Sequence, residues 1–204
     1  MNRTRSQILS AIAALALGAG CSTDNPRGSA EPTGATIIGG ETVTDVPKPS
    51  APKIPASQQE AQDTVFNYLQ RTVDSLPRGT KLDATDFRGG ANMSCEDEPM
   101  TDTPPTRFEY WTHVVAGGGA NSDDLINKTG DAWHSWGADV KERDDFRKPN
   151  RFGYFPDGYE LQIKGAAKPG YPPTLIVTSP CFPGDVARTD IPSPRTIDQT
   201  PQAG

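Results

Sequence analysis

Two histidines, His113 and His134, occur in the chain, and histidine is the side chain that most often carries acid–base and metal chemistry at neutral pH. A zinc site needs three or four His, Cys or carboxylate ligands at a workable spacing. No paired motif of such ligands lies near either histidine, and the Gly-x-Ser-x-Gly motif of α/β-hydrolase nucleophiles does not occur. The sequence therefore predicts no metal site, no catalytic triad and no cofactor.

Two other patterns match ion-binding sites only superficially. The glycine run 117–119 precedes a predicted helix, as in phosphate-binding loops, but Asp123 and Asp124 in the first helical turn would repel an anion. The acidic run 96–98, with Asp102, offers oxygen ligands for Ca²⁺, yet its spacing matches no calcium loop. We interpret the first pattern as a turn and the second as a solvated acidic loop.

Residues 1–20 have the order of features of an export signal. Arg3 and Arg5 supply positive charge, an apolar run covers residues 8–17, and small residues occupy positions 18–20. The apolar run is roughly ten residues long, whereas a helix needs about 20 to span a bilayer. The segment is therefore predicted to direct export and then to be removed as a signal peptide.

Cys21 follows directly on the small residues Gly18-Ala19-Gly20. This arrangement resembles the lipobox of bacterial lipoproteins, although Gly18 occupies the position where that pattern prefers leucine. The resemblance implies that Cys21 becomes the lipid-carrying N-terminus and holds the mature chain to the outer face of the cell membrane. The alternative is an ordinary secretory signal followed by a chance cysteine.

The charge of the chain argues against nucleic acid as a partner. The formal net charge is −6, and loss of Arg3 and Arg5 with the signal peptide makes it −8. Phosphate binding needs clustered Lys and Arg, and no such cluster occurs. An acidic surface also disfavours adhesion to anionic headgroups, so we expect the membrane contact to be the lipid on Cys21.

Composition divides the rest of the chain into three parts. Residues 21–55 are rich in Pro, Gly, Ser and Thr and are predicted to form a disordered tether. Residues 56–186 have the size of one domain. Residues 187–204, with three prolines among polar residues, are predicted to form a disordered tail.

Hydrophobic periodicity predicts two helices and four strands in the domain. Ser57 and Glu60 form a capping box at the start of the first helix, 57–76, and Asn121 or Ser122 begins the second. The predicted strands are 80–87, 108–115, 159–164 and 174–178. We therefore expect an α+β fold, a two-layer sandwich in which an antiparallel sheet of about four strands carries both helices on one face, in the order α-β-β-α-β-β.

Cys95 and Cys181 are the cysteines that remain once Cys21 carries lipid. In the oxidising environment outside the membrane, such a pair usually forms a disulfide. We predict a bridge between Cys95 and Cys181, with two separate buried thiols as the alternative.

The three tryptophans are candidates for ligand contact. Trp133 and Trp136 lie three residues apart and share a face of the second helix, where they either fill the core or line an aromatic groove. Trp111 lies on the Glu109 and His113 side of its strand, which period-two alternation assigns to solvent. We therefore predict that Trp111 is exposed, and it is the first choice for a contact residue.

Several stretches together resemble the mycobacterial LppA and LppV type of lipoprotein. The resemblance rests on Cys21, the helix before Cys95, the Cys95-Glu96 pair, the sequence GYEL at 158–161 and the sequence SPCF at 179–182. It implies an envelope lipoprotein with a two-layer α+β domain and a cysteine pair, and it implies no activity.

The expected function is that of a lipid-anchored, non-catalytic binding domain of the cell envelope. Its partner would be an envelope protein, a glycan or a lipid. Two alternatives of other classes stay open: a cell-envelope hydrolase whose active residues are dispersed in the sequence, and a purely structural envelope component.

Lipid attachment can be tested by changing Cys21 to Ala. We expect incorporation of a fatty-acid probe in the parent protein and none in Cys21→Ala, because no other segment before the domain is both long and apolar enough to insert in a bilayer. Metabolic labelling followed by purification measures this directly. Label that persists in the variant, or that is missing from the parent, would contradict the prediction.

Overall fold

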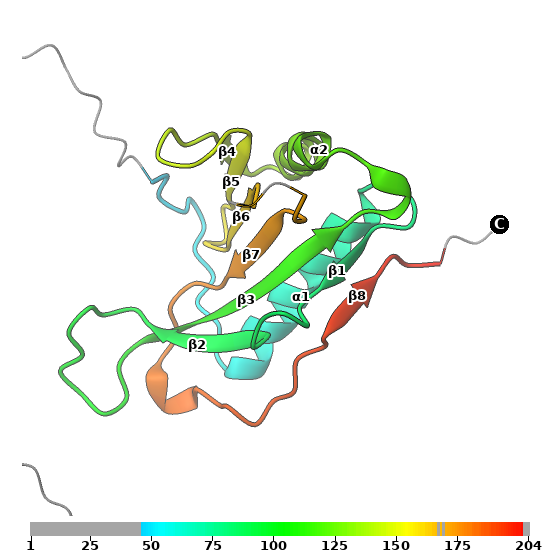
Figure 1. The fold of residues 1–204 in the computed structure, drawn as a ribbon. Coiled ribbons are helices and arrows are strands. Elements are labelled where there is room, and N and C mark those ends of the chain that lie inside the picture. The colour runs from blue at the N-terminus through cyan, green and yellow to red at the C-terminus, as the bar shows by residue number, and fades with distance from the viewer. Residues whose placement is uncertain (1–45, 167, 169, 202–204) are drawn as a thin grey trace, which may run out of the picture. The chain divides into compact units, whose positions relative to one another are not determined.

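In the part of the chain that the structure describes, one antiparallel sheet of eight strands and two α-helices make an α+β fold (Figure 1). The computed structural model describes residues 46–201 except 167 and 169, all of which belong to the unit Thr42–Gly204. The predicted signal peptide, Cys21 and the first part of the tether lie outside the described residues. Within the described part, no helix has both the length and the apolar character needed to cross a membrane.

The elements follow one another along the chain without long interruptions. They are α1 (Gln58–Asp74), β1 (Lys81–Asp83), β2 (Gly90–Ser94), β3 (Thr106–Val115), the 3₁₀ turn η1 (Gly117–Gly119), α2 (Ser122–Ser135), β4 (Asp139–Lys141), β5 (Asn150–Tyr154), β6 (Glu160–Lys164), β7 (Thr174–Thr178), the 3₁₀ turn η2 (Gly184–Val186) and β8 (Thr196–Asp198). The order in the sheet is β4-β5-β6-β7-β3-β1-β8, and β2 also pairs with β3. The long strand β3 pairs with β7 along one edge and with β1 and β2 along the other.

The sheet has eight strands, so the prediction of about four is wrong. The four predicted strands correspond to β1, β3, β6 and β7, and β6 pairs with β7 in antiparallel register as expected. The strands β4 and β8 have three residues each, and β2 and β5 contain Gly90 and Gly153. None of these four shows a run of alternating apolar residues, and their strand conformation depends on pairing with neighbouring strands.

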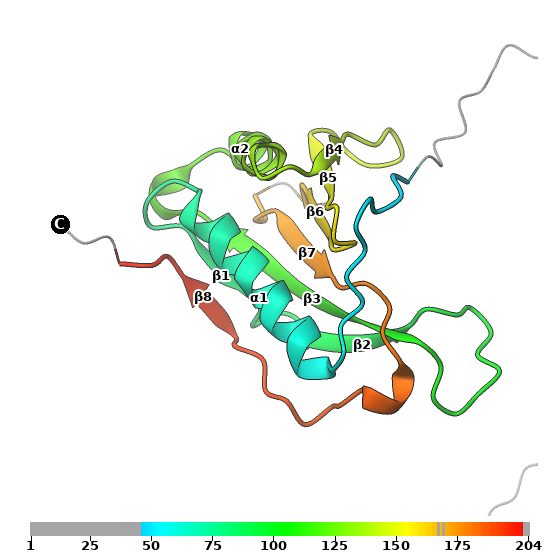
Figure 2. The ribbon, with the colours of Figure 1, turned by 180° about the vertical axis from the view of Figure 1, so that it is seen from behind.

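Both helices pack on one face of the sheet, α1 against β1, β3, β7 and β8, and α2 against β4, β5 and β6. In Figure 2, α1 lies in front of the sheet. The helix α1 begins where the capping box predicts, because Glu60 N donates to Ser57 Oγ (3.1 Å) and Glu60 Oε2 accepts from Ala56 N (2.9 Å). Its core-facing stripe consists of Ala61, Val65, Leu69 and Val73, all fully buried.

Trp133 of α2 joins the two helices to the sheet. Its indole Nε1 donates to Thr72 Oγ1 of α1 (3.1 Å), and both side chains are fully buried. The other side of the indole lies against β5, where a Cβ added to Gly153 would come within 2.9 Å of Trp133 Cε3. Gly153 is therefore required for the helix to approach the strand, and one side chain fixes three elements relative to each other.

The C-terminal segment was predicted to be a disordered tail, and the structure corrects this. Its strand β8 pairs with β1, with Ile197 opposite Leu82. Beyond β8, Gln199 Nε2 donates to the carbonyl oxygens of Val73 and Leu76 (2.9 Å each) at the C-terminal end of α1. The polar, proline-rich sequence does not predict this role. Capping a helix end needs only one amide group, and an amide group leaves no apolar pattern in the sequence.

The last residues of the predicted tether are also held by the domain. Ala51 N donates to Pro156 O and Lys53 N donates to Asp157 O, both at 2.9 Å. Pro156 and Asp157 lie in the turn between β5 and β6. The chain therefore joins the domain several residues before the predicted boundary at residue 56.

Cys95 and Cys181 lie at disulfide distance, with their Sγ atoms 2.07 Å apart and their Cα atoms 6.3 Å apart. Cys95 follows β2, and Cys181 follows β7. Next to the bridge, Thr106 and Phe182 exchange two backbone hydrogen bonds of 2.9 and 2.8 Å. The bridge thus fastens the β2–β3 hairpin to the segment that leaves β7.

Removal of the bridge in the variant Cys95→Ala/Cys181→Ala should lower the free energy of unfolding by about 4–5 kcal/mol, because the bridge closes a long loop in the unfolded chain. The two cysteines are separated by 86 residues. Urea unfolding of the full-length protein measures the change, and Cys21→Ala, which keeps both domain cysteines, is the matched control. Two alkyl adducts on unreduced, unfolded parent protein would show that the thiols are free.

Candidate binding site

The face of the sheet opposite the helices, which we call the open face, carries one row of side chains in register across four strands. Trp111 of β3 lies opposite Ile176 of β7, Ile176 lies opposite Gln162 of β6, and Gln162 lies opposite Phe152 of β5. These four residues are the central row. The residues next to them in each strand point toward the helices, because side chains alternate between the two faces of a sheet.

Two residues of the central row are buried although no helix lies over them in the described part of the chain. Ile176 has 1% and Phe152 has 6% of its surface exposed, and neither belongs to the core cluster under the helices. Side chains of the open face itself therefore cover them. Trp111, with 37% exposed, is the large apolar side chain of the row that stays accessible.

The segment 142–149, between β4 and β5, covers the Phe152 end of the central row. The ring centroid of Phe146 lies 5.3 Å from that of Phe152. The Arg143 guanidinium lies 5.0 Å from the Phe152 centroid, and Lys164 Nζ lies 4.8 Å from the Phe146 centroid. Cations at these distances are attracted by the faces of the rings, so this end of the row is closed by the protein's own groups.

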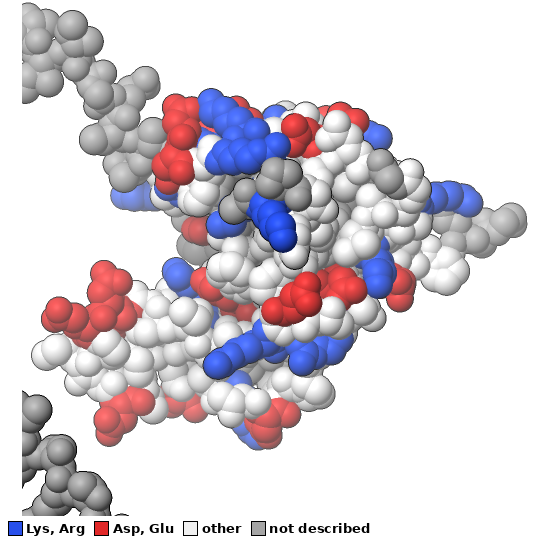
Figure 3. All heavy atoms as spheres, in the orientation of Figure 1, with Lys and Arg blue, Asp and Glu red and all other residues white. Residues whose placement is uncertain are grey.

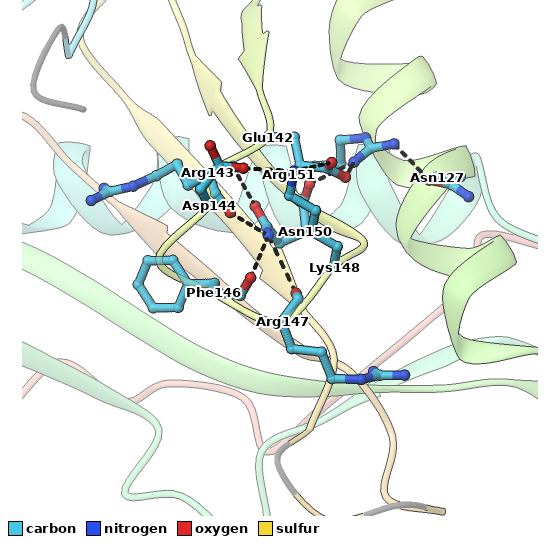
Figure 4. Close-up of polar contacts among 9 residues, drawn as sticks. All are labelled: Asn127, Glu142, Arg143, Asp144, Phe146, Arg147, Lys148, Asn150 and Arg151. Atoms are coloured by element: carbon cyan, nitrogen blue, oxygen red, sulfur yellow. Dashed lines mark hydrogen bonds and ion pairs between the residues drawn. The ribbon is translucent and has the colours of Figure 1, made fainter. Parts of the chain in front are cut away.

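Asn150, at the start of β5, holds the segment 142–149 in place (Figure 4). Its side chain is fully buried, and Nδ2 donates to the carbonyl oxygens of Arg143 (2.9 Å), Arg147 (3.2 Å) and Phe146 (3.4 Å). Its Oδ1 accepts from Arg143 N (2.8 Å). One amide thus satisfies four backbone groups of a turn that has no strand partner.

Arg151, the next residue, links the same segment to α2 (Figure 4). Its guanidinium donates to Asn127 Oδ1 (2.7 Å) and forms an ion pair with Glu142, and hydrogen bonding to Arg151 lowers the pKa of Glu142. The aliphatic part of Arg151 packs on α2, where a Cβ added to Gly130 would lie 2.6 Å from Arg151 Cγ. The segment is therefore held from both faces of the sheet.

The other end of the central row is a small aromatic cluster. Trp111 Nε1 donates to Glu109 Oε2 (3.2 Å), which fixes the indole on the strand. The ring centroid of Phe87, from the segment after β1, lies 6.1 Å from that of Trp111 and 4.6 Å from that of His113. His113 Nε2 in turn lies 3.8 Å from Asp86 Oδ2. We call Trp111, Phe87 and His113 the Trp111 cluster.

Charged groups surround the less polar middle of this face. Hydrogen bonds from Thr85 lower the pKa of Asp83 to about 2, so Asp83 is ionised at neutral pH. Desolvation by neighbouring groups raises the pKa of Glu160, although the residue is exposed, and Arg107 opposes that effect. Figure 3 shows acidic and basic side chains around an uncharged region in the middle of the face.

The three tryptophans predicted as contact residues have different environments. Trp111 lies exposed on the open face, as the alternation of β3 predicts. Trp133 is corrected to a core residue, because α2 lies so close to β5 that the indole fills the space between them and has no exposed surface. Trp136 is half-buried, and the Arg71 guanidinium lies 4.3 Å from its ring centroid.

The patterns that superficially matched ion-binding sites have structural explanations. In the glycine run, a Cβ added to Gly117 would lie 2.9 Å from Gly79 O, so glycine permits close contact of two loops. The acidic run 96–98 is exposed in the β2–β3 connection, and His134 is exposed near the end of α2. Among the described residues, no group of three or more His, Cys, Asp or Glu is placed to hold a metal ion.

No protein-family model, curated protein or solved structure matches this chain.

The role of Asn150 can be tested by Asn150→Ala. We expect the free energy of unfolding to fall by about 2–4 kcal/mol, because several backbone groups lose their partner at a buried position. Urea unfolding measures the difference. Asn92→Ala is the matched control, since Asn92 Nδ2 makes a single exposed hydrogen bond to Arg188 O, and it should cost about 1 kcal/mol or less. Equal losses in the two variants would contradict the role assigned to Asn150.

Proposed function

We propose that this chain is a lipid-anchored binding protein of the cell envelope that recognises its ligand on the open face of the sheet and catalyses no reaction. The observation that carries the proposal is the position of Trp111. It is a large aromatic side chain, 37% exposed, in the interior of a sheet face that neither of the described helices covers. Tryptophan supplies a large contact area and is enriched among residues that dominate binding energy.

The position of Trp111 in an interior strand favours a binding role. Trp111 is paired with Ile176 of β7 on one side of β3, and on the other side its neighbours Tyr110 and His113 are paired with β2 and β1. The hydrogen bond to Glu109 restricts the indole further. A contact residue held this way loses little conformational freedom on binding, and more of the contact energy is available for affinity.

The proposed lipid anchor leaves the open face accessible. Lipid at Cys21, followed by the tether that composition predicts, would present the domain outside the membrane. The turn between β5 and β6, where residues 51–53 are bound, lies at the ends of strands and not on the open face. Attachment through this segment therefore leaves the central row available to a partner.

The proposal is tested by photo-crosslinking in intact cells. A benzoylphenylalanine residue replaces Trp111 in one variant of the full-length protein and Asp63, exposed on α1, in a matched control. We expect a light-dependent adduct of defined mass from position 111 only, because the ligand contacts the open face and not the helical layer. Adducts from position 63 alone, equal adducts from both positions, or none from position 111 would contradict the proposal.

A further inference from the structure

Several aromatic rings at the surface of this protein are paired with the protein's own cations. The pairs include Arg71 over Trp136, Lys164 over Phe146 and Lys168 over Tyr171. The distances from the charged group to the ring centroid are 4.3, 4.8 and 4.9 Å. None of the cation–ring pairs found among the described residues involves Trp111 or Phe87. The most accessible tryptophan thus has a ring face that an external cation can reach.

The geometry of the Trp111 cluster leaves room for such a group. The rings of Trp111 and Phe87 are inclined at 53° with centroids 6.1 Å apart, so they do not stack face to face. The hydrogen bond from Trp111 Nε1 to Glu109 leaves the face of the indole unused. A cation is attracted by the negative face of an aromatic ring when it lies within about 6 Å of the centroid.

The charges beside the cluster favour a cation. Asp83 is paired with Lys81 (3.1 Å) and Glu109 with Arg107 (3.1 Å). Asp86 differs, because its ion-pair neighbour among the described residues is His113 (3.8 Å), and its side chain is 76% exposed. Among the ion pairs of the described residues, Asp86 therefore has no Lys or Arg partner beside the cluster.

We propose that the Trp111 cluster binds an arginine side chain of a partner protein, with the guanidinium against Trp111 and Phe87 and in an ion pair with Asp86. Arginine fits better than lysine, because a planar guanidinium stacks on a ring and binds a carboxylate through two hydrogen bonds at once. The partner's arginine would lie over Trp111 in the same way as Arg71 lies over Trp136 within the protein. The inference names the ligand class for the open face and rests on the proposed function.

The test is a titration of the full-length protein in detergent, labelled with ¹⁵N at the tryptophan indoles, with a hexa-arginine peptide. We expect the indole signal of Trp111 to move saturably, while the signals of buried Trp133 and of Arg71-covered Trp136 stay in place. Hexa-serine and hexa-glutamate peptides should leave all three signals unchanged.

Variants locate the binding groups. Trp111→Leu should weaken hexa-arginine binding by about two- to fivefold, the range of a cation–π contact at an exposed site. Asp86→Asn should weaken it and reduce its dependence on salt, since a screened charge pair is lost. Trp136→Leu is the matched control and should bind as the parent does, because that ring already has an internal cation.

Three outcomes would overturn the inference: an unmoved Trp111 signal, unchanged affinity in Trp111→Leu, or a response to hexa-glutamate equal to that to hexa-arginine. A light-dependent adduct at position 111 together with any of these would leave the open-face binding function standing and reject arginine as the ligand group. Absence of both the adduct and the titration response would reject the two proposals together.

Discussion

The packing of Trp133 between α1, α2 and β5 is the contact on which the rest of the structure depends. Each helix covers a different part of the sheet, α1 over the β1, β3, β7 and β8 side and α2 over the β4, β5 and β6 side. A fully buried indole that is bonded to Thr72 and packed against Gly153 joins these parts. Close packing of this kind permits little adjustment, so the position of each helix determines that of the other.

The open face is a consequence of this core. Because the side-chain period of a strand is two residues, burying Leu161, Leu175 and Val177 under the helices places Gln162 and Ile176 on the opposite face. A slip of one residue would put those apolar groups into solvent. The central row therefore inherits its register from the helical layer. Its own neighbours cover Ile176 and Phe152, which keeps the exposed apolar area of this face small.

Features with a strong local signal could be predicted from the sequence. The capping box of α1 and the alternation of β3 and β6 are encoded within a few residues, and so is the outward position of Trp111. The features that could not be predicted from the sequence depend on contacts between segments that are distant along the chain. Phe87 reaches the Trp111 cluster only because its loop follows β1, and Trp133 is buried only because Gly153 admits it. Asn150 and Gln199 act through single amide groups, which leave no periodic pattern in a sequence.

The place of β8 at the end of the chain has a consequence for the timing of folding. Its partner β1 and the helix end that Gln199 caps both lie in the first half of the sequence, so they are completed only by a segment that lies far away along the chain. Contacts of such long sequence separation form slowly, because a large loop must close before they contribute any stability. The domain therefore cannot complete its sheet until the segment around β8 has reached β1.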